Sequence, residues 1–288
     1  MATRTWQGGT GGSTTDYSVA GNWVEGAVPV AGDAVTIMPN PDGTVYNITA
    51  GLNQAGVAIT SFVVDQSYTG TIAATGGYLL LNVTTAVAIN GNGAMYIDCS
   101  AANLLELNVR MDEDTAGHLY WKGPTVSGIV LHRGVMTHVS GTATAFYVSL
   151  VDDEDDDSTL TWTAGTATLM VVLGGSITMN GGTWSGYRQT AGEVIVKTGT
   201  VTSPDIHGGT FDYRSVTTLG LLECYGESAV FTLANDVRPK TITTINARGT
   251  PTLNLDNGAD TITFTNGVKI LGKPTIVWPK SLRSMDWA

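Results

Sequence analysis

The chain lacks long apolar runs, helical periodicity and clustered cysteines, and each absence excludes a class of protein. No run approaches the ~18 apolar residues of a membrane span, so we expect no membrane partner. No window of about 15 residues repeats apolar side chains with the helical period, so we predict an all-β protein. Cys99 and Cys224 are the two cysteines. They lie far apart in apolar contexts, which excludes a metal-type pair and predicts two buried thiols.

Positive charge is also scarce. The 14 Lys and Arg residues face 25 Asp and Glu residues, and the net charge is −11. A surface of that sign repels phosphate backbones, so we expect no nucleic-acid partner. Residues 1–15 contain one arginine and no apolar core, so we expect no signal peptide there and a soluble chain.

Threonine and glycine are abundant, with 43 and 36 residues respectively. The branched Cβ of threonine fits a pleated surface, and glycine permits tight corners. The clearest pattern spans residues 169–213, where an apolar run, a glycine step, an alternating run and a Gly-Gly-Thr-aromatic corner occur twice. Gly175, Gly199 and Gly226 follow one another at intervals of roughly 25 residues, which is typical of solenoids. We predict a single right-handed parallel β-helix over residues 38–272.

The two ends differ from the repeats. Residues 1–37 are loop-rich and hold Trp6 and Trp23, and the open end of a solenoid needs a cover. We interpret residues 1–37 as an N-terminal cap. Residues 273–288 contain a segment with proline near both ends, which argues against a central strand. We predict an irregular C-terminal tail that either covers the last turn or docks on another subunit.

The N-terminal segment carries a resemblance. Its motifs are Trp-x-Gly-Gly at residues 6–9, Asn22-Trp23, Pro29 and Gly-Asp-x-Val-x-Ile at residues 32–37. In this order they resemble the start of many right-handed parallel β-helix proteins of bacterial surfaces and bacteriophage virions. The resemblance covers roughly residues 4–82. It implies a fold and a virion setting, and it transfers no catalytic residue.

One acidic run is a candidate metal site. Its carboxylates suit Ca²⁺, which prefers oxygen ligands, but they lack the alternating spacing of a Ca²⁺ loop. We favour a solvated loop, with no cofactor, and keep a Ca²⁺ site as the alternative. The candidate ligands are Asp152, Asp153, Asp155, Asp156 and Asp157.

Other candidate residues are scattered. Of the four histidines (His118, His132, His138 and His207), the two at 132 and 138 could stack on neighbouring turns. A glycosidase needs two carboxylates at a fixed separation. The sequence offers Asp98, Asp112, Asp205 and Asp212 without saying which align. Four aromatic residues that we expect to face outward could stack on sugar rings: Tyr147, Trp184, Tyr187 and Tyr213. For Trp184 and Phe211 we favour packing on the glycine backbones of the corners.

We hypothesise a non-enzymatic structural protein of a phage virion, a capsid decoration or fibre component assembled in the host cytoplasm. The alternatives are a carbohydrate-binding or carbohydrate-cleaving β-helix and an extracellular bacterial adhesin. The expected partners are further copies of the chain in a homotrimer, a capsid or other virion protein, and surface glycans. Large apolar residues near the termini are the candidate partner-binding residues: Trp6, Trp23, Ile276, Trp278, Leu282, Met285 and Trp287.

Overall fold

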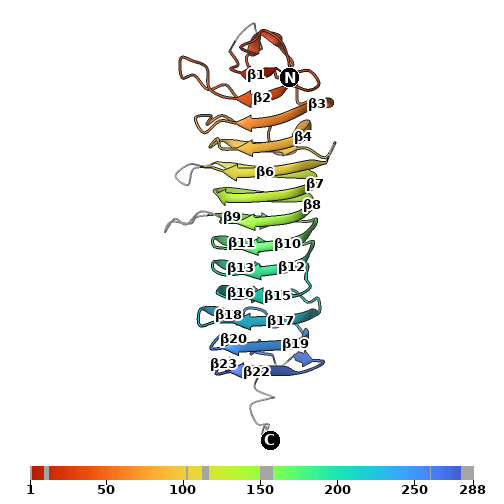
Figure 1. Ribbon diagram of the computed structural model, residues 1–288, viewed down its shortest axis with the longest axis vertical. Helices are drawn as coiled ribbons and strands as arrows, with labels where there is room; N and C mark the ends of the chain where they lie inside the picture. The colour runs from red at the N-terminus through yellow and green to blue at the C-terminus, as the bar shows by residue number, and fades with distance from the viewer. Residues whose placement is uncertain are drawn as a thin grey trace, which may run out of the picture. The chain divides into compact units, whose positions relative to one another are not determined.

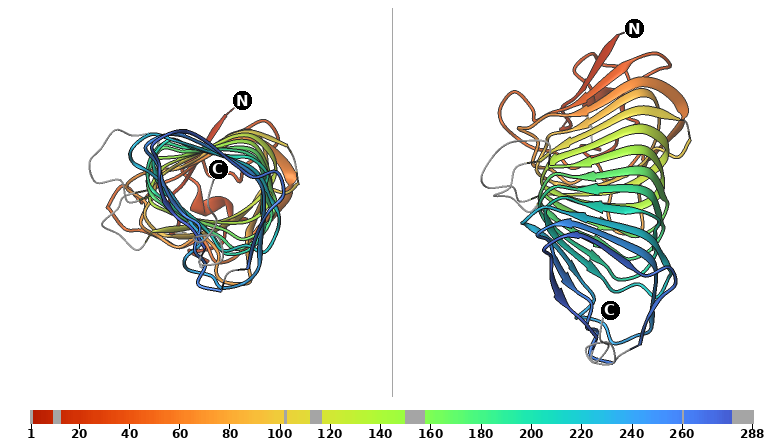
Figure 2. Two further views of the ribbon diagram at one scale, coloured as in Figure 1. Left: turned by 90° about the horizontal axis from the view of Figure 1, so that it is seen from below. Right: turned by 60° about the horizontal axis from the view of Figure 1, so that its bottom comes forward.

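Parallel strand pairing dominates the computed structural model, which describes residues 2–9, 13–101, 103–111, 117–149, 158–259 and 261–279. The described residues form 23 strands and one short 3-10 helix, η1 (Ala20–Asn22), so the all-β prediction is confirmed. The chain divides into two compact units, Met1–Thr159 and Leu160–Ala288. Figures 1 and 2 show the strands of each unit lying side by side.

The first unit is built from eight strands. They are β1 (Thr3–Trp6), β2 (Ala34–Ile37), β3 (Asn53–Val64), β4 (Leu79–Ile89), β5 (Ala94–Asp98), β6 (Leu104–Arg110), β7 (His118–Arg133) and β8 (Val135–Val148). Parallel ladders join β1 to β2, β2 to β3, β3 to β4, β4 to β6, β6 to β7 and β7 to β8. Strand β5 pairs with β4 and β7.

The second unit contains more and shorter strands. They are β9 (Thr159–Trp162), which begins at the unit boundary, β10 (Thr166–Val172), β11 (Ser176–Met179), β12 (Thr183–Gln189), β13 (Glu193–Val196), β14 (Thr200–Val201), β15 (Pro204–Ile206), β16 (Gly209–Tyr213), β17 (Leu219–Tyr225), β18 (Ala229–Thr232), β19 (Lys240–Gly249), β20 (Thr252–Asn254), β21 (Ile262–Phe264), β22 (Val268–Gly272) and β23 (Thr275–Val277). Two long series of parallel ladders run through them: β10–β12–β15–β17–β19–β22 and β11–β13–β16–β18–β20–β23.

Register in these ladders builds the core of the second unit. Alternate residues of a strand face one side, so in-register parallel strands stack their inward side chains in columns. One column is Ile177, Val194, Phe211, Phe231, Leu253 and Ile276. The first five are fully buried, and burying a side chain of this size stabilises the fold by about 1.5–3 kcal/mol. The rings of Phe211 and Phe231 stack with centroids 6.2 Å apart.

The period predicted from the glycine spacing is wrong. Thr166 lies opposite Thr183, which lies opposite Thr200, so each step along the sequence is shorter there than the spacing of Gly175 and Gly199. These two glycines belong to different columns. The carbonyl of Gly175 accepts a hydrogen bond from the amide of Glu193. The amide of Thr200, the residue after Gly199, donates instead to the carbonyl of Gly182. The number of residues between paired positions is larger from β18 to β20 and from β20 to β23, because the intervening turns are longer.

Aromatic packing organises the N-terminal segment. The Tyr17 and Trp23 rings meet edge to face at 4.7 Å, and Trp6 stacks on Tyr17 at 6.2 Å. Trp23 Nε1 donates to the Tyr17 carbonyl at 2.9 Å. Trp6 and Trp23 are 0% and 1% exposed, so the expectation that they form a partner-binding surface is wrong. Their large apolar rings fill the interior of their own chain instead.

The C-terminal segment is more regular than predicted. Residues 275–277 form β23, in register with β20, so the prediction of an irregular tail is wrong for these residues. Ile276 extends the interior column, and Ile276 and Trp278 are both half-buried. The remaining candidates Leu282, Met285 and Trp287 lie outside the described residues.

Replacing Gly192 with alanine tests the close stacking of the glycine turns. Gly192 has φ +78°, and a Cβ there would lie 2.5 Å from the Gly175 carbonyl oxygen. Gly258 has φ +76° but no atom within 4 Å of such a Cβ. Both substitutions carry the left-handed backbone cost of about 1–2 kcal/mol, and G192A adds an overpacking cost of about 1–3 kcal/mol. Denaturant unfolding should show G192A clearly less stable than G258A, and equal losses would contradict the stacking.

Candidate functional site

The candidate metal ligands yield no site that can be described. Asp152, Asp153, Asp155, Asp156 and Asp157 lie outside the described residues. Among the residues that are described, no three His, Cys, Asp or Glu side chains gather closely enough to hold a metal ion. Cys99 and Cys224 are buried free thiols, as predicted, and burial raises the pKa of Cys224 to about 12.

The histidines occupy four different environments. His118 stacks on Tyr120 at 4.0 Å, and His207 stacks on Tyr225 at 5.0 Å. His138 is buried opposite Trp121, so it does not stack on His132 in the ladder. Burial, with a contribution from the Arg110 cation, lowers the pKa of His132 and favours its neutral form.

No ladder of the described residues pairs two members of the predicted carboxylate set. Asp98 lies in the first unit and Asp112 outside the described residues, while Asp205 has Glu223 as its ladder neighbour. Asp205 is bound by Arg188 Nε at 3.1 Å and by His207 Nε2 at 2.8 Å. Arg188 holds Asp205 Oδ2 in an ion pair, while Asp205 Oδ1, close to His207, is buried without a hydrogen-bond partner among the described residues.

Most of the predicted sugar-stacking aromatics are buried. Trp184, Tyr187 and Tyr213 are 0%, 3% and 0% exposed, so they pack in the core and cannot contact a glycan. Burial raises the pKa of Tyr187 strongly, and its hydroxyl donates to Gln189 Oε1 at 2.7 Å. Tyr147 is half-buried. Trp184 and Phe211, for which packing at the corners is favoured, are both buried, whereas the expectation that Tyr187 and Tyr213 face outward is wrong.

The structure instead gathers Tyr78, Tyr96 and Tyr120 on the outer face of the first unit. Tyr96 and Tyr120 lie in register and stack at 4.3 Å with parallel rings, while Tyr78 meets Tyr96 edge to face at 5.8 Å. Lys122 Nζ lies 3.9 Å from the Tyr78 ring centroid. The Tyr120 ring stacks on the Tyr96 ring and also on the His118 ring. Since neighbouring groups cover these ring faces, the cluster stiffens the sheet rather than offering a platform for sugars.

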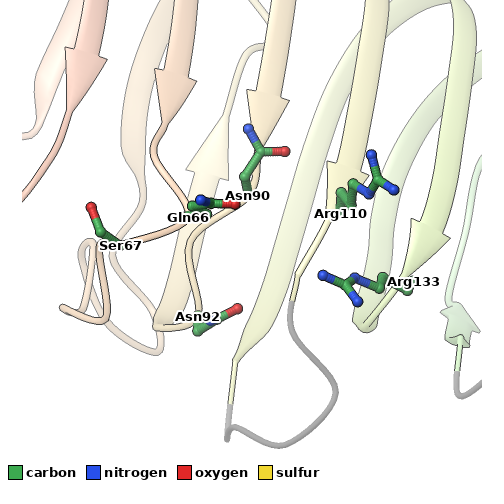
Figure 3. Close-up of a pocket in the computed structure, with 6 residues that line it drawn as sticks. All are labelled: Gln66, Ser67, Asn90, Asn92, Arg110 and Arg133. Atoms are coloured by element: carbon green, nitrogen blue, oxygen red, sulfur yellow. The ribbon is translucent and has the colours of Figure 1, made fainter.

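A polar pocket of the first unit lies at the carboxyl ends of its strands. Val64, Ile89, Val109 and Leu131 form one row across β3, β4, β6 and β7. Parallel strands end at the same edge, so the residues that follow this row meet there. They enclose a cavity of about 750 Å³ lined by Gln66, Ser67, Asn90, Asn92, Arg110 and Arg133. Figure 3 shows these six side chains at the ends of neighbouring strands.

Hydrogen-bond donors dominate the lining of this pocket. Arg110 lies opposite Arg133 in the ladder, and in the described part of the chain neither guanidinium has a carboxylate within ion-pair distance. Arg133 Nε is buried without a hydrogen-bond partner among those residues. Ser67 is tied to Asp65, whose carboxylate accepts its amide at 2.9 Å and its hydroxyl at 2.5 Å. The sequence did not reveal the arginine pair, because its two members lie far apart along the chain and only strand pairing brings them together.

A buried charged network supports the second unit. Asp212 Oδ2 accepts hydrogen bonds from Arg214 Nη2 at 2.7 Å and Asn235 Nδ2 at 2.7 Å. Asp236 accepts hydrogen bonds from Arg238 and Lys240. The Lys240 side chain is fully buried, and its ammonium also donates to the Arg214 carbonyl at 2.8 Å. The Asp212 carboxylate is therefore structural as well.

No protein-family model, curated protein or solved structure matches this chain. No helix of the described residues is long and apolar enough to cross a membrane. The function proposed below therefore rests on the described residues and their geometry.

Replacing Asp236 with asparagine tests the buried network. The change leaves the Lys240 ammonium without its counter-charge, at an expected cost of about 3 kcal/mol in the free energy of unfolding at pH 7. Hydrogen bonds from Arg238 and Lys240 hold the pKa of Asp236 far below its usual range. The contribution of Asp236 to the free energy of unfolding is therefore complete above its unfolded pKa of about 4, and it is lost as the pH falls through the folded pKa.

Urea unfolding should thus show a constant gap between the wild type and D236N from about pH 5 to pH 8, narrowing below about pH 4. Glu227 is exposed in the same unit, so the control E227Q should change stability by less than about 0.5 kcal/mol. A D236N variant as stable as the wild type at pH 7 would contradict the assigned role.

Proposed function

We propose that the chain is a right-handed parallel β-helix that serves as a rigid, non-enzymatic building block of a virion surface. The observation that carries the proposal is the in-register stacking of parallel strands, with one column of apolar side chains continuing from Ile177 to Ile276. A ladder of this kind satisfies the backbone hydrogen bonds of every interior strand and leaves few elements free to move. Rigidity of this kind suits a structural component.

The virion setting is an expectation from the resemblance of the N-terminal motifs. Under this proposal the chain is a capsid decoration or fibre component, assembles in the host cytoplasm and needs no cofactor. Ca²⁺ binding by residues 152–157 and an extracellular adhesin remain the alternatives. The arginine ion pairs that hold Asp205 and Asp212 favour a non-enzymatic role over polysaccharide cleavage.

Exposed apolar side chains on the last strands support self-assembly. Ile270 and Leu271 on β22 are 42% and 48% exposed, and Val277 on β23 is 38% exposed. The last strands also present a backbone edge, which other chains can cover. We propose that the contact with another subunit or with the shell involves these last strands and residues 281–288, which follow them in the sequence. We propose a homotrimer as the closed assembly.

Light scattering on the full-length chain should give three times the mass of one chain. L271E should shift the protein toward monomers, because a charge at an apolar interface is costly. Leu105, 60% exposed on β6, provides the control L105E, which should keep the trimer. Deleting residues 281–288 should weaken assembly or shell binding while circular dichroism stays unchanged. A monomeric wild type at high concentration that binds no shell would refute the proposal.

The protein should also release no reducing ends or unsaturated products from bacterial polysaccharides. The physical reason is that Asp205 and Asp212, the candidate carboxylates of the second unit, are held in ion pairs with arginine. A panel of purified capsular and lipopolysaccharide glycans, incubated with the full chain, provides the measurement. Product formation that D205N abolishes would assign an enzymatic role instead.

A further inference from the structure

The pair Arg110 and Arg133 stands out in a chain with 14 basic residues out of 288. Strand pairing sets Arg110 of β6 against Arg133 of β7, immediately after a register irregularity at Val109, and like charges on paired strands destabilise a sheet. Elsewhere, Arg4, Arg188, Arg214 and Arg238 each have an aspartate partner. The two arginines of the pocket have no such partner among the described residues. An anion between them would offset the repulsion.

The remaining lining adds neutral hydrogen-bonding groups. Gln66, Asn90 and Asn92 contribute amides, and Ser67 contributes a hydroxyl. An amide offers both donors and an acceptor, which suits ligand hydroxyl groups, whereas a guanidinium suits a planar or tetrahedral oxyanion. The described lining residues include no carboxylate, and the nearby Asp65 carboxylate is engaged by the amide and hydroxyl of Ser67.

The volume limits the size of the ligand. About 750 Å³ lies within the range of small-ligand sites and exceeds the need of one inorganic anion. Arg133 Nε is buried without a hydrogen-bond partner among the described residues, which is costly, and a bound oxyanion would satisfy it.

We infer that this pocket binds a sugar that carries a carboxylate or sulfate group. Arg110 and Arg133 hold the anionic group, and the amides of Gln66 and Asn90 contact sugar hydroxyls. This binding activity goes beyond a structural role and does not depend on the virion setting or on trimer formation.

Isothermal titration of the full-length protein tests the inference. The probes are digalacturonate, a sulfated disaccharide, neutral maltose, sodium phosphate and a short single-stranded oligodeoxynucleotide. At least one acidic disaccharide should bind, and maltose and phosphate should bind at least ten-fold more weakly than it does. No binding of either acidic disaccharide, equal binding of maltose or phosphate, or tighter binding of the oligonucleotide would each overturn the inference. The stronger of the two acidic probes distinguishes a carboxylate ligand from a sulfate ligand.

Substitutions locate the binding. R110Q and R133Q should each weaken binding of the acidic disaccharide at least ten-fold, and R188Q, which removes an exposed arginine of the second unit, should leave it unchanged. R110K keeps the charge but loses the planar fork, so an intermediate loss is expected. Circular dichroism checks the fold of each variant. If a glutamine variant fails to fold, R110K and R133K replace it, and binding as tight as in the wild type would overturn the assignment.

A second measurement follows Arg133 directly. The arginine Nε–Hε resonance of Arg133, assigned through its loss in R133K, should shift when the acidic disaccharide is added. A ligand that binds without shifting this resonance occupies another place, and that result also overturns the inference.

Discussion

The in-register parallel hydrogen-bond ladder is the constraint on which the rest of the structure depends. Because neighbouring strands pair in register, the position of a residue in its strand determines which side chains of the two adjacent strands lie beside it. Buried positions must then be apolar in column after column, as from Ile177 to Leu253. The same rule brings Tyr96 against Tyr120 on an outer face, where stacking adds to the stability of the sheet.

Turns are constrained as tightly as strands. Where neighbouring turns stack directly, the carbonyl of one glycine accepts a hydrogen bond from the turn that follows, as Gly192 does from Thr210. A side chain at Gly192 would collide with the backbone of Gly174 and Gly175. Where turns are longer, hydrogen bonds from polar side chains replace these backbone hydrogen bonds. In the second unit Asp236 and Lys240 tie the segment before β19 to the Arg214 carbonyl.

The ladder also explains where binding chemistry can arise. Strand interiors commit their backbone groups to neighbours, so polar side chains that the ladder does not use collect beyond the strand ends. Arg110 and Arg133 follow a buried row of valine, isoleucine and leucine, which holds their backbones at the spacing of two paired strands. A rigid scaffold that positions loop residues is the usual basis of a binding site. A structural role and a binding role are therefore compatible in one chain.

The sequence by itself determined the all-β class, the buried thiols and the packing of Trp184 within the fold, because alternation and composition are local properties. It did not determine which strands pair. Gly175 and Gly199 share a motif but belong to different columns, since pairing depends on how many residues each turn consumes, and packing sets that number. The burial of Trp6 and Trp23 likewise depends on the three-ring cluster that they form with Tyr17. The Arg110–Arg133 pair exists only through the register of β6 against β7, so the tertiary structure alone decided the pocket.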